Sequence, residues 1–348
     1  PSMQKIILIG GQAGQGIAKT SYLIAKAFTK AGYYAFNYRD YPSLIKGGHN
    51  FNILKISSKP VYSHETKYDI ILALDQKTID KHKKNLVKNG FILGDKNLQA
   101  KNLIGIDVRS TLKKLKAPPL IGNNILVGYL FKLLGLPLDI LTKTIKKDLA
   151  HLDKAKLDTI KRALKEGYNL PGEKRESLKT KNEKKYFLTG NEAIASGAIA
   201  SGLDVYIAYP MTPATPVLHY LASKQLEHNI LVLQLENEIA VINAALGASF
   251  AGAISMVGTS GGGFALMSEA MSLQGISEIP LVVYLAQRTA PSTGVPTYTS
   301  QGDLKFAVNV GHGEFPKIVI APGDSKEAIS RTQEAFYLSQ KYRVLSII

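Results

Sequence analysis

The amino-acid sequence predicts an α/β protein with two domains, on three observations. Short apolar segments alternate with longer segments of helical periodicity, which is the pattern of a sheet covered by helices. The chain has 348 residues, roughly twice the length of a common domain. Its charge is unevenly divided, because residues 1–185 hold 35 Lys and Arg against 15 Asp and Glu, a net charge of +20, whereas residues 186–348 hold 8 against 12, a net charge of −4.

The composition excludes several classes of protein. Hydrophobic residues make up 45% of the chain and charged residues 20%, which is typical of a soluble globular protein. No apolar run reaches the ~18 residues that span a bilayer, and no charged leader precedes the first apolar segment, so we expect a cytoplasmic protein that contacts no membrane. The sequence has no cysteine, which excludes disulfides, cysteine-bound metal clusters and a cysteine nucleophile in this chain. The cations of the first half are nearly all lysines without interleaved aromatics, so nucleic acid is not an expected partner.

The first half alternates strands and helices. It begins with a strand at residues 5–9, a glycine loop at residues 10–16, and a helix at residues 17–30 that stops near Gly32. Strands are predicted at residues 33–37, 51–56, 70–74, 91–93 and 103–106, with another after a turn at residues 58–60 and a helix at residues 76–88. From Gly122 to Gly167 the periodicity is helical, and Pro137 is expected to begin a new helix.

A charged segment separates the two halves. Residues 170–185 contain nine charged residues, a Pro-Gly pair and only two leucines, a composition that cannot form a core. We therefore expect one domain at residues 1–170, a linker at residues 171–186, and a second domain at residues 187–348.

The second half predicts a mainly parallel sheet covered by helices. Its strands are expected at residues 205–208, 230–235, 253–257, 281–286, 317–320 and 344–348, and its helices at residues 192–201, 216–223, 238–250, 264–273 and 325–341.

Polar residues follow four consecutive strands of this second sheet. Ligands of open α/β sheets bind at the carboxyl ends of the strands, so these residues predict one crevice for an organic anion. They are Thr212 and Thr215, then Glu236 and Glu238, then Thr259, Ser260 and the glycines Gly261, Gly262 and Gly263, and finally Arg288. The three glycines indicate that another group approaches the backbone closely or that φ is positive. Arginine can bind a carboxylate through two parallel hydrogen bonds.

Each feature also has a purely structural interpretation. A threonine after a strand is often only a helix cap. A glutamate in the first turn of a helix is favoured by the helix dipole in any protein. Arg288 could form a structural ion pair.

The glycine loop of the first half leaves three interpretations open. Gly11, Gly14 and Gly16 have the spacing G-x-x-G-x-G, the reverse of the dinucleotide fingerprint, although Asp40 lies near the end of the second strand as a nicotinamide site requires. The segment from Gly16 to Thr20 resembles a P-loop in which two residues separate the glycine from Lys-Thr. An anion site at the start of a helix is favoured over both.

Several motifs resemble one family in order along the chain. The segments YPMTPATP (209–216), QLENEIA (234–240), GTSGGGFALMSEA (258–270) and QRTAPSTGVPTYTSQGDL (287–304) are similar to the α subunit of 2-oxoacid:ferredoxin oxidoreductases. GQAGQG (11–16), YPSLIKGGHN (41–50) and ILKISSKPV (53–61) resemble the γ subunit, which many members fuse in front of α. Met211, Ala290 and Lys46 stand where the family usually has isoleucine, glycine and arginine, and none of these differences removes a polar group from the predicted active site.

The resemblance implies a subunit of a thiamine diphosphate enzyme that oxidatively decarboxylates a 2-oxoacid, such as pyruvate or 2-oxoglutarate, to acyl-CoA and CO2 and passes electrons to ferredoxin. It assigns the second half to the domain that binds the aminopyrimidine ring, with Glu238 as the catalytic carboxylate on that ring. Thr259, Ser260, Gly261 and Gly262 join it as cofactor-binding residues. Thr212, Thr215 and Arg288 are implied to bind the substrate, and the loop with Gly11, Gly14 and Gly16 to bind a phosphate of coenzyme A.

Missing motifs imply a partner. Thiamine enzymes hold the diphosphate and Mg²⁺ with a GDG segment, which this sequence lacks. We therefore expect no metal site here, Mg²⁺ ligands and iron–sulfur clusters in a β subunit, and a heterodimer whose shared active site the β subunit completes. The family's α chain usually continues into a further C-terminal domain, which we do not expect within these residues, so the sequence is expected to be either a truncated form or a compact member of the family. Two alternatives stay open, a subunit of another thiamine-dependent decarboxylase and a non-catalytic module that binds nucleotides or coenzyme A.

Overall fold

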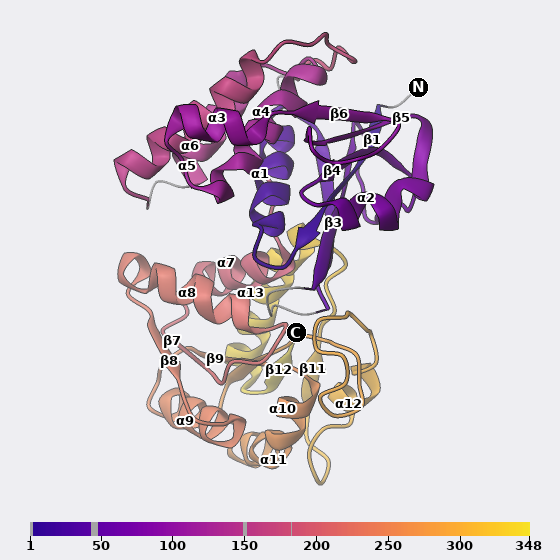
Figure 1. Cartoon of the computed structure of the whole chain (residues 1–348). Coiled ribbons are helices and arrows are strands. Elements are labelled where there is room, and N and C mark those ends of the chain that lie inside the picture. The colour runs from indigo at the N-terminus through magenta and orange to yellow at the C-terminus, as the bar shows by residue number, and fades with distance from the viewer. Residues whose placement is uncertain (1–2, 43–47, 149–151, 182) are drawn as a thin grey trace. The chain divides into compact units, whose positions relative to one another are not determined.

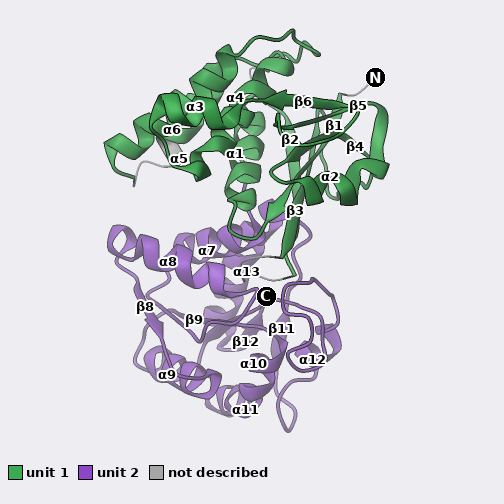
Figure 2. Ribbon diagram, in the orientation of Figure 1, with its two compact units in different colours: residues 1–187 green, residues 188–348 purple. Residues whose placement is uncertain are grey.

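The computed structural model describes residues 3–42, 48–148, 152–181 and 183–348. The chain forms two compact units, residues 1–187 and residues 188–348 (Figure 2). Each unit has its own six-stranded sheet (Figure 1). The predicted α/β fold with two sheets, the second of them parallel, is confirmed.

The sheet of unit 1 is mixed, with the strand order β2-β3-β1-β4-β5-β6. The central strand β1 pairs antiparallel with β3, and β3 pairs antiparallel with β2. On the other side, β4, β5 and β6 run parallel to β1. The strands are β1 (Gln4–Gln12), β2 (Tyr34–Asp40), β3 (His49–Ser57), β4 (Tyr68–Ala73), β5 (Leu86–Asp95) and β6 (Leu103–Ile106).

Helices cover both faces of this sheet because alternate residues of β1 are apolar on both sides. Ile7 and Ile9 face the larger core with α1, whereas Ile6 and Leu8 face the smaller core with α2. The helices are α1 (Ile17–Lys30), α2 (Gln76–His82), α3 (Val108–Leu115), α4 (Gly122–Leu133), α5 (Leu138–Asp148) and α6 (Lys154–Asn169), with 3₁₀ turns at Lys83–Asn85 and Pro119–Ile121.

The helix α1 and the strand β6 have the bounds that the sequence predicts, and α5 begins directly after Pro137. Two predictions for unit 1 are wrong. Residues 58–67 form no strand after the turn, and the helix expected at residues 76–88 ends at His82 because the chain enters β5 at Leu86. The helix α3 was not predicted. Its eight residues follow Asp107, whose carboxylate accepts a hydrogen bond from the amide of Ser110 and caps the helix.

The segment expected as a linker runs along unit 1. The amides of Arg175 and Glu176 donate to the carbonyl of Leu133, and the amide of Lys181 donates to the carbonyl of Ala31. Lys5 and Glu176 form an ion pair at 2.6 Å. This charged segment is therefore held by backbone hydrogen bonds rather than by an apolar core of its own.

The sheet of unit 2 has the strand order β11-β12-β10-β9-β7-β8, and its paired strands are all parallel. The strands are β7 (Val205–Ala208), β8 (Leu231–Gln234), β9 (Ser255–Thr259), β10 (Leu281–Leu285), β11 (Lys317–Val319) and β12 (Leu345–Ile347). The helices are α7 (Gly190–Ala200), α8 (Thr215–His228), α9 (Glu238–Phe250), α10 (Gly261–Leu266), α11 (Ser268–Ser277), α12 (Leu304–Val308) and α13 (Ser325–Tyr342).

Alternation along the strands assigns the helices of unit 2 to two faces. Ile207 and Val257 pack with α9, α10 and α11, whereas Tyr206 and Met256 pack with α7, α8 and α13. The strand β7 and the helix α9 have their predicted bounds. The helix expected at residues 264–273 is two helices that meet at Met267, and the short helix α12 was not predicted. No helix in the described part of the chain is long and apolar enough to span a membrane.

Candidate functional site

The candidate site lies at the carboxyl edge of the unit 2 sheet. Its strands are parallel, so the segments that follow β7, β8, β9 and β10 all leave the sheet at the same edge. These segments, together with Thr259 at the end of β9, carry every site residue that the sequence predicts for this half of the chain.

Glu238 is a buried carboxylate at the start of α9. Asn237 caps this helix, because its side-chain oxygen accepts a hydrogen bond from the amide of Ala240 at 2.8 Å. The side chain of Glu238 is only 3% exposed, and its Oε1 atom has no hydrogen-bond partner in the described structure. Glu236 is exposed. A buried carboxylate oxygen without a donor is costly, so it is suited to receive a donor from a bound ligand.

Gly263 explains one of the three adjacent glycines. A Cβ atom at this position would stand 2.6 Å from Oε1 of Glu238 and would also collide with Oγ1 of Thr259. None of the three glycines has a positive φ. Of the two explanations that the sequence offered, close approach therefore applies at Gly263. Nothing lies within 4 Å of a Cβ atom at Gly262.

Thr259 and Ser260 directly precede α10, the helix that contains Gly263. Both are fully buried, and Oγ of Ser260 has no hydrogen-bond partner in the described structure. Oγ1 of Thr259 lies 3.9 Å from the sulfur of Met211, in the segment after β7. The segments after β7, β8 and β9 therefore meet at α10.

Arg288 joins the fourth segment to the first. The residue is 9% exposed, and its Nη1 donates to the carbonyl oxygen of Thr212 at 2.8 Å. Its Nε atom is buried without a hydrogen-bond partner among the described residues. Thr215 is the first residue of α8, and its amide donates to the carbonyl of Met211. The structure thus brings Arg288 next to the backbone of Thr212, and Thr215 lies one helix turn further on.

Asp303 is a site residue that was not singled out in the sequence. It is 8% exposed, its amide donates to Oε1 of Gln287 at 3.1 Å, and its Oδ2 atom has no partner in the described structure. Burial raises the pKa of this carboxyl group. A Cβ atom at Gly261 would lie 3.3 Å from Asp303 Oδ1. An acidic residue directly before a mainly apolar pentapeptide with one lysine was the only signal for it, and that pattern is common at helix starts.

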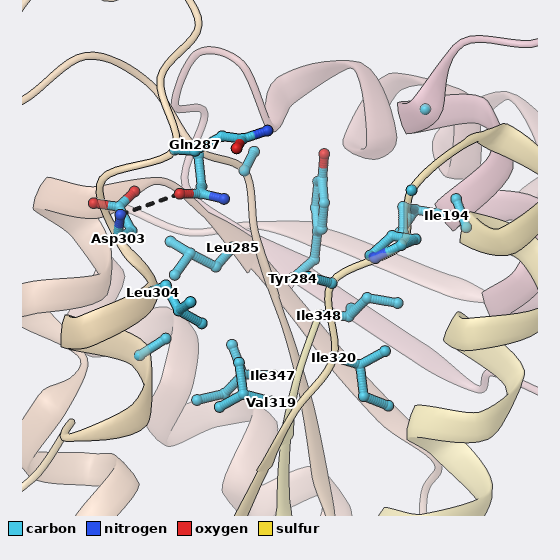
Figure 3. A pocket seen from close by; sticks show the side chains of 18 of the residues that line it. Ile194, Tyr284, Leu285, Gln287, Asp303, Leu304, Val319, Ile320, Ile347 and Ile348 are labelled. Carbon is cyan, nitrogen blue, oxygen red and sulfur yellow. Dashed lines mark hydrogen bonds between the residues drawn. The ribbon is translucent and has the colours of Figure 1, made fainter. Parts of the chain in front are cut away.

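A pocket of about 560 Å³ lies beside Asp303, at the carboxyl ends of β10, β12 and β11. Figure 3 shows Gln287 and Asp303 at one margin and the apolar side chains of Leu285, Val319 and Ile347 below them. It lies at the same edge of the sheet as the candidate site.

The described residues fit the pyrimidine half of a thiamine diphosphate site. The unpartnered Oε1 of Glu238 offers an acceptor for a ring N–H, and Gly263 leaves room beside it. No group of three His, Asp or Glu side chains that could hold a metal ion is found in the described ranges.

The glycine loop of unit 1 is held by its own hydrogen bonds. Gly14 and Gly16 have φ values of 95° and 79°, a backbone conformation that glycine adopts without strain. Oε1 of Gln15 accepts from the amide of Gln12 at 2.7 Å, and Asn123 donates to the carbonyl of Gln15 at 2.7 Å. Gly11 belongs to β1. Lys46, in the neighbouring motif, lies outside the described residues.

Unit 1 also contains a buried histidine pair that sequence reasoning missed. The Nε2 atoms of His49 and His82 lie 2.9 Å apart, and each residue is 8% exposed. Burial, followed by the influence of His49 and Lys81, lowers the pKa of His82 to about 4. The two residues are 33 positions apart, so no local pattern marks them as a pair.

Two family models match the chain. Residues 196–348 match "Pyruvate flavodoxin/ferredoxin oxidoreductase, thiamine diP-bdg", and residues 6–170 match "Pyruvate ferredoxin/flavodoxin oxidoreductase". The "2-oxoacid:ferredoxin oxidoreductase subunit alpha" of a Sulfolobus species is 33% identical over 97% of this chain and 62% of that protein. The subunit of the same name from Saccharolobus solfataricus is 34% identical over 97% of this chain and 62% of that protein.

A further relative and one solved structure extend the comparison. The "2-oxoglutarate synthase subunit KorA" of Archaeoglobus fulgidus is 40% identical over 46% of this chain and 46% of that protein. The solved structure is the 2-oxoglutarate:ferredoxin oxidoreductase from Magnetococcus marinus with 2-oxoglutarate, coenzyme A and succinyl-CoA bound. It matches this chain with a TM-score of 0.85 and 30% sequence identity, over 99% of this chain and 63% of that one. This chain thus spans under two thirds of the length of the Sulfolobus and Magnetococcus proteins.

Proposed function

Since the chain belongs to the 2-oxoacid:ferredoxin oxidoreductase family, we propose that it acts as an α subunit of such an enzyme. The reaction is the oxidative decarboxylation of a 2-oxoacid to acyl-CoA and CO2, with the electrons passed to ferredoxin. In this proposal unit 2 supplies the half of a thiamine diphosphate site that holds the aminopyrimidine ring. A ferredoxin-reducing complex of this kind is expected in the cytoplasm.

One observation carries the proposal. The carboxylate of Glu238 is buried, and its Oε1 atom lacks a donor while lying against Gly263. Thiamine diphosphate, when bound, supplies a thiazolium carbon that becomes nucleophilic after it loses a proton, provided that a carboxylate hydrogen-bonds to the pyrimidine ring. Glu238 would be that carboxylate. Its position in the first turn of α9 favours the ionised form, since the positive end of the helix dipole stabilises a nearby anion.

The residues that we assign to the substrate lie at the same edge of the sheet as Glu238. Arg288 is the only Lys or Arg in the described segments after β7, β8, β9 and β10 that carry the site. Its Nε has no partner, so the guanidinium keeps donor capacity for the carboxylate of a 2-oxoacid. The bond from Nη1 to the Thr212 carbonyl orients it. We assign Thr212 and Thr215 to the substrate side of the site, and Thr259, Ser260, Gly261 and Gly262 to the cofactor side.

A β subunit completes the site in this proposal. Large apolar side chains are exposed on the helices that surround Glu238, as expected of an interface. They are Ile239 and Phe250 of α9, Leu266 of α10, and Leu273 and Ile276 of α11. We assign the Mg²⁺ ligands and the iron–sulfur cluster to that partner, because the sequence has neither a GDG segment nor a cysteine.

Coenzyme A enters as the co-substrate. We assign its anionic end to the glycine loop of unit 1, where Gly14 and Gly16 have positive φ values and Gly16 is the N-cap of α1. The net charge of +20 over residues 1–185 would attract such a ligand. The Magnetococcus structure was solved with coenzyme A bound, which supports the ligand but not this location in our chain.

The test is purification of the native complex followed by a panel of 2-oxoacids with coenzyme A and a viologen dye as electron acceptor. We expect dye reduction that requires a 2-oxoacid, coenzyme A and thiamine diphosphate, and a co-purifying subunit that carries an iron–sulfur cluster. A stable solitary chain, or a complex that decarboxylates without reducing the dye or ferredoxin, would overturn the proposal.

A further inference from the structure

A group of polar side chains interrupts the apolar face that the sheet of unit 1 presents to α1. On this face β3 contributes Leu54, which packs in the core with α1, and the β2 residue opposite it is Asn37. Two residues further along β2 the residue is Arg39, and the β3 residue opposite it is Asn52. Alternate residues of a strand share a face, so Asn37, Arg39 and Asn52 all lie on the side of α1.

The side chain of Asn37 is fixed by two donors. Its Oδ1 atom accepts hydrogen bonds from Oγ of Ser21, on α1, at 2.7 Å and from Nδ2 of Asn52 at 3.2 Å. These bonds assign the oxygen, so the amide nitrogen of Asn37 points elsewhere. That nitrogen is buried and has no acceptor in the described residues. The network therefore connects α1 to the sheet and leaves one oriented donor unused.

Arg39 provides a second donor without an acceptor. Its Nε atom is buried and has no hydrogen-bond partner in the described part of the chain. The guanidinium lies over the ring of Tyr41, with Cζ 4.3 Å from the ring centroid. A stacked guanidinium keeps its N–H groups in its own plane, where they can bind an acceptor. Because a buried donor that stays unpaired is costly, Arg39 and Asn37 together are suited to receive an anion.

The two donors lie at the edge of the sheet where the glycine loop begins. The strands β1 and β2 both run antiparallel to β3, so their carboxyl ends are at the same edge. Arg39 is the penultimate residue of β2, and Gly11 is the penultimate residue of β1. The helix α1, which follows the loop, has neither a side-chain cap nor an acidic residue in its first turn. Its first amides are therefore also without a side-chain acceptor.

This arrangement matches the chemistry of a ribose phosphate. In dinucleotide-binding α/β folds a diphosphate binds at the helix start after the first strand, and an arginine near the end of the second strand accommodates a phosphate on the ribose. Arg39 has this position along the chain of unit 1, although β3 lies between β2 and β1 in the sheet. Coenzyme A has both groups, a diphosphate and a phosphate monoester on its ribose, and dephospho-coenzyme A lacks only the monoester.

We propose that Arg39 and Asn37 bind the ribose phosphate of coenzyme A and select coenzyme A over dephospho-coenzyme A. The inference rests on the proposed function, which has the anionic end of the coenzyme at the glycine loop, and it adds the side chains that recognise the coenzyme. A purely structural role explains the bonds to Oδ1 of Asn37, but it leaves both unpaired donors without a function.

The experiment measures binding to the native complex by calorimetric titration, with two pairs of ligands that differ by one ribose phosphate. The pairs are coenzyme A with dephospho-coenzyme A, and NADP⁺ with NAD⁺. We expect dephospho-coenzyme A to bind at least tenfold more weakly than coenzyme A, because a charge-assisted contact is lost, and neither nicotinamide coenzyme to approach the affinity of coenzyme A. Equal dissociation constants for coenzyme A and its dephospho form, or a phosphate preference only in the nicotinamide pair, overturn the inference.

Two variants locate the preference. Arg39→Met removes the donors but keeps the length of the side chain, and Asn37→Asp keeps an oxygen for Ser21 and Asn52 while placing a carboxylate near Arg39. In each variant coenzyme A should bind at least tenfold more weakly, and dephospho-coenzyme A should be affected much less, so that the preference is lost. Arg162→Met, at an exposed position of α6, removes the same charge elsewhere in unit 1 and should keep the preference. A preference that survives Arg39→Met, or that Arg162→Met reduces as much, contradicts the assignment.

The binding measurements also separate this inference from the proposed function. If the complex reduces the dye with a 2-oxoacid and coenzyme A, but Arg39→Met leaves the ratio of dissociation constants unchanged, only the inference is rejected. If no 2-oxoacid is oxidised, the proposed function is rejected, whereas the same ratio still decides whether Arg39 and Asn37 bind a ribose phosphate.

Discussion

Oε1 of Glu238 lies 2.6 Å from the point at which a Cβ atom of Gly263 would stand. Because the carboxylate is buried between α9 and α10, a methyl group at this point must displace it. The glycine therefore preserves the position of the one acid on which the proposed cofactor site depends.

Gly263→Ala should consequently disturb the site more than the fold. We expect thiamine diphosphate binding to the native complex to weaken at least tenfold, and the free energy of unfolding to fall by about 1–3 kcal/mol from overpacking. Calorimetric titration with the cofactor and chemical denaturation measure the two effects. Gly247→Ala, in the interior of α9, is the control, since a Cβ atom there meets nothing within 4 Å. It should leave binding unchanged and stabilise α9 by about 0.5–1 kcal/mol.

Glu238→Gln keeps the size of the side chain but removes its charge. In the native complex we expect loss of thiamine-dependent decarboxylation by about 100-fold or more, in line with the loss of a catalytic acid–base group, while the subunits still assemble. Exchange of the thiazolium C2 proton, followed by NMR in deuterated buffer, reports the activation step directly. Glu236→Gln, at an exposed position two residues earlier, should exchange at the normal rate. Normal exchange in Glu238→Gln would remove this residue from its proposed role.

The sequence predicts this region well where local patterns decide the structure. The strand β7 is a short apolar run and α9 has a cap at Asn237, so both have the expected bounds. The burial of Glu238 and the exposure of Glu236 depend instead on packing against α10, a long-range contact. The same holds for Asp303, whose isolation from donors results from the fold of the whole segment after β10. Local sequence patterns do not predict contacts between residues that lie far apart along the chain.

Arg288→Ala removes the guanidinium that joins the segments after β7 and β10. The loss of one charge-assisted hydrogen bond costs about 1.5–3 kcal/mol, which corresponds to a rise in the KM for the 2-oxoacid of about 10- to 150-fold. Steady-state kinetics with a viologen dye measures it. Arg288→Lys should recover only part of the loss, because an ammonium cannot form the bidentate pair. The control is Arg331→Ala, at an exposed position on α13, which should leave KM unchanged. If Arg288→Ala also leaves KM unchanged, Arg288 does not belong to the substrate site.

The pair of His49 and His82 predicts how stability responds to acid. Burial lowers the pKa of His82 from 6.5 to about 4, so between these pH values the unfolded chain binds a proton that the folded chain does not. The free energy of unfolding should therefore decrease as the pH falls through this window, by about 3 kcal/mol from this residue. Denaturant titrations at pH 7.5, 6 and 5 measure the slope. His82→Phe should flatten it, whereas His219→Asn, at an exposed position, should not. Equal slopes in His82→Phe and the parent chain would show that the pKa of His82 is not lowered in the folded chain.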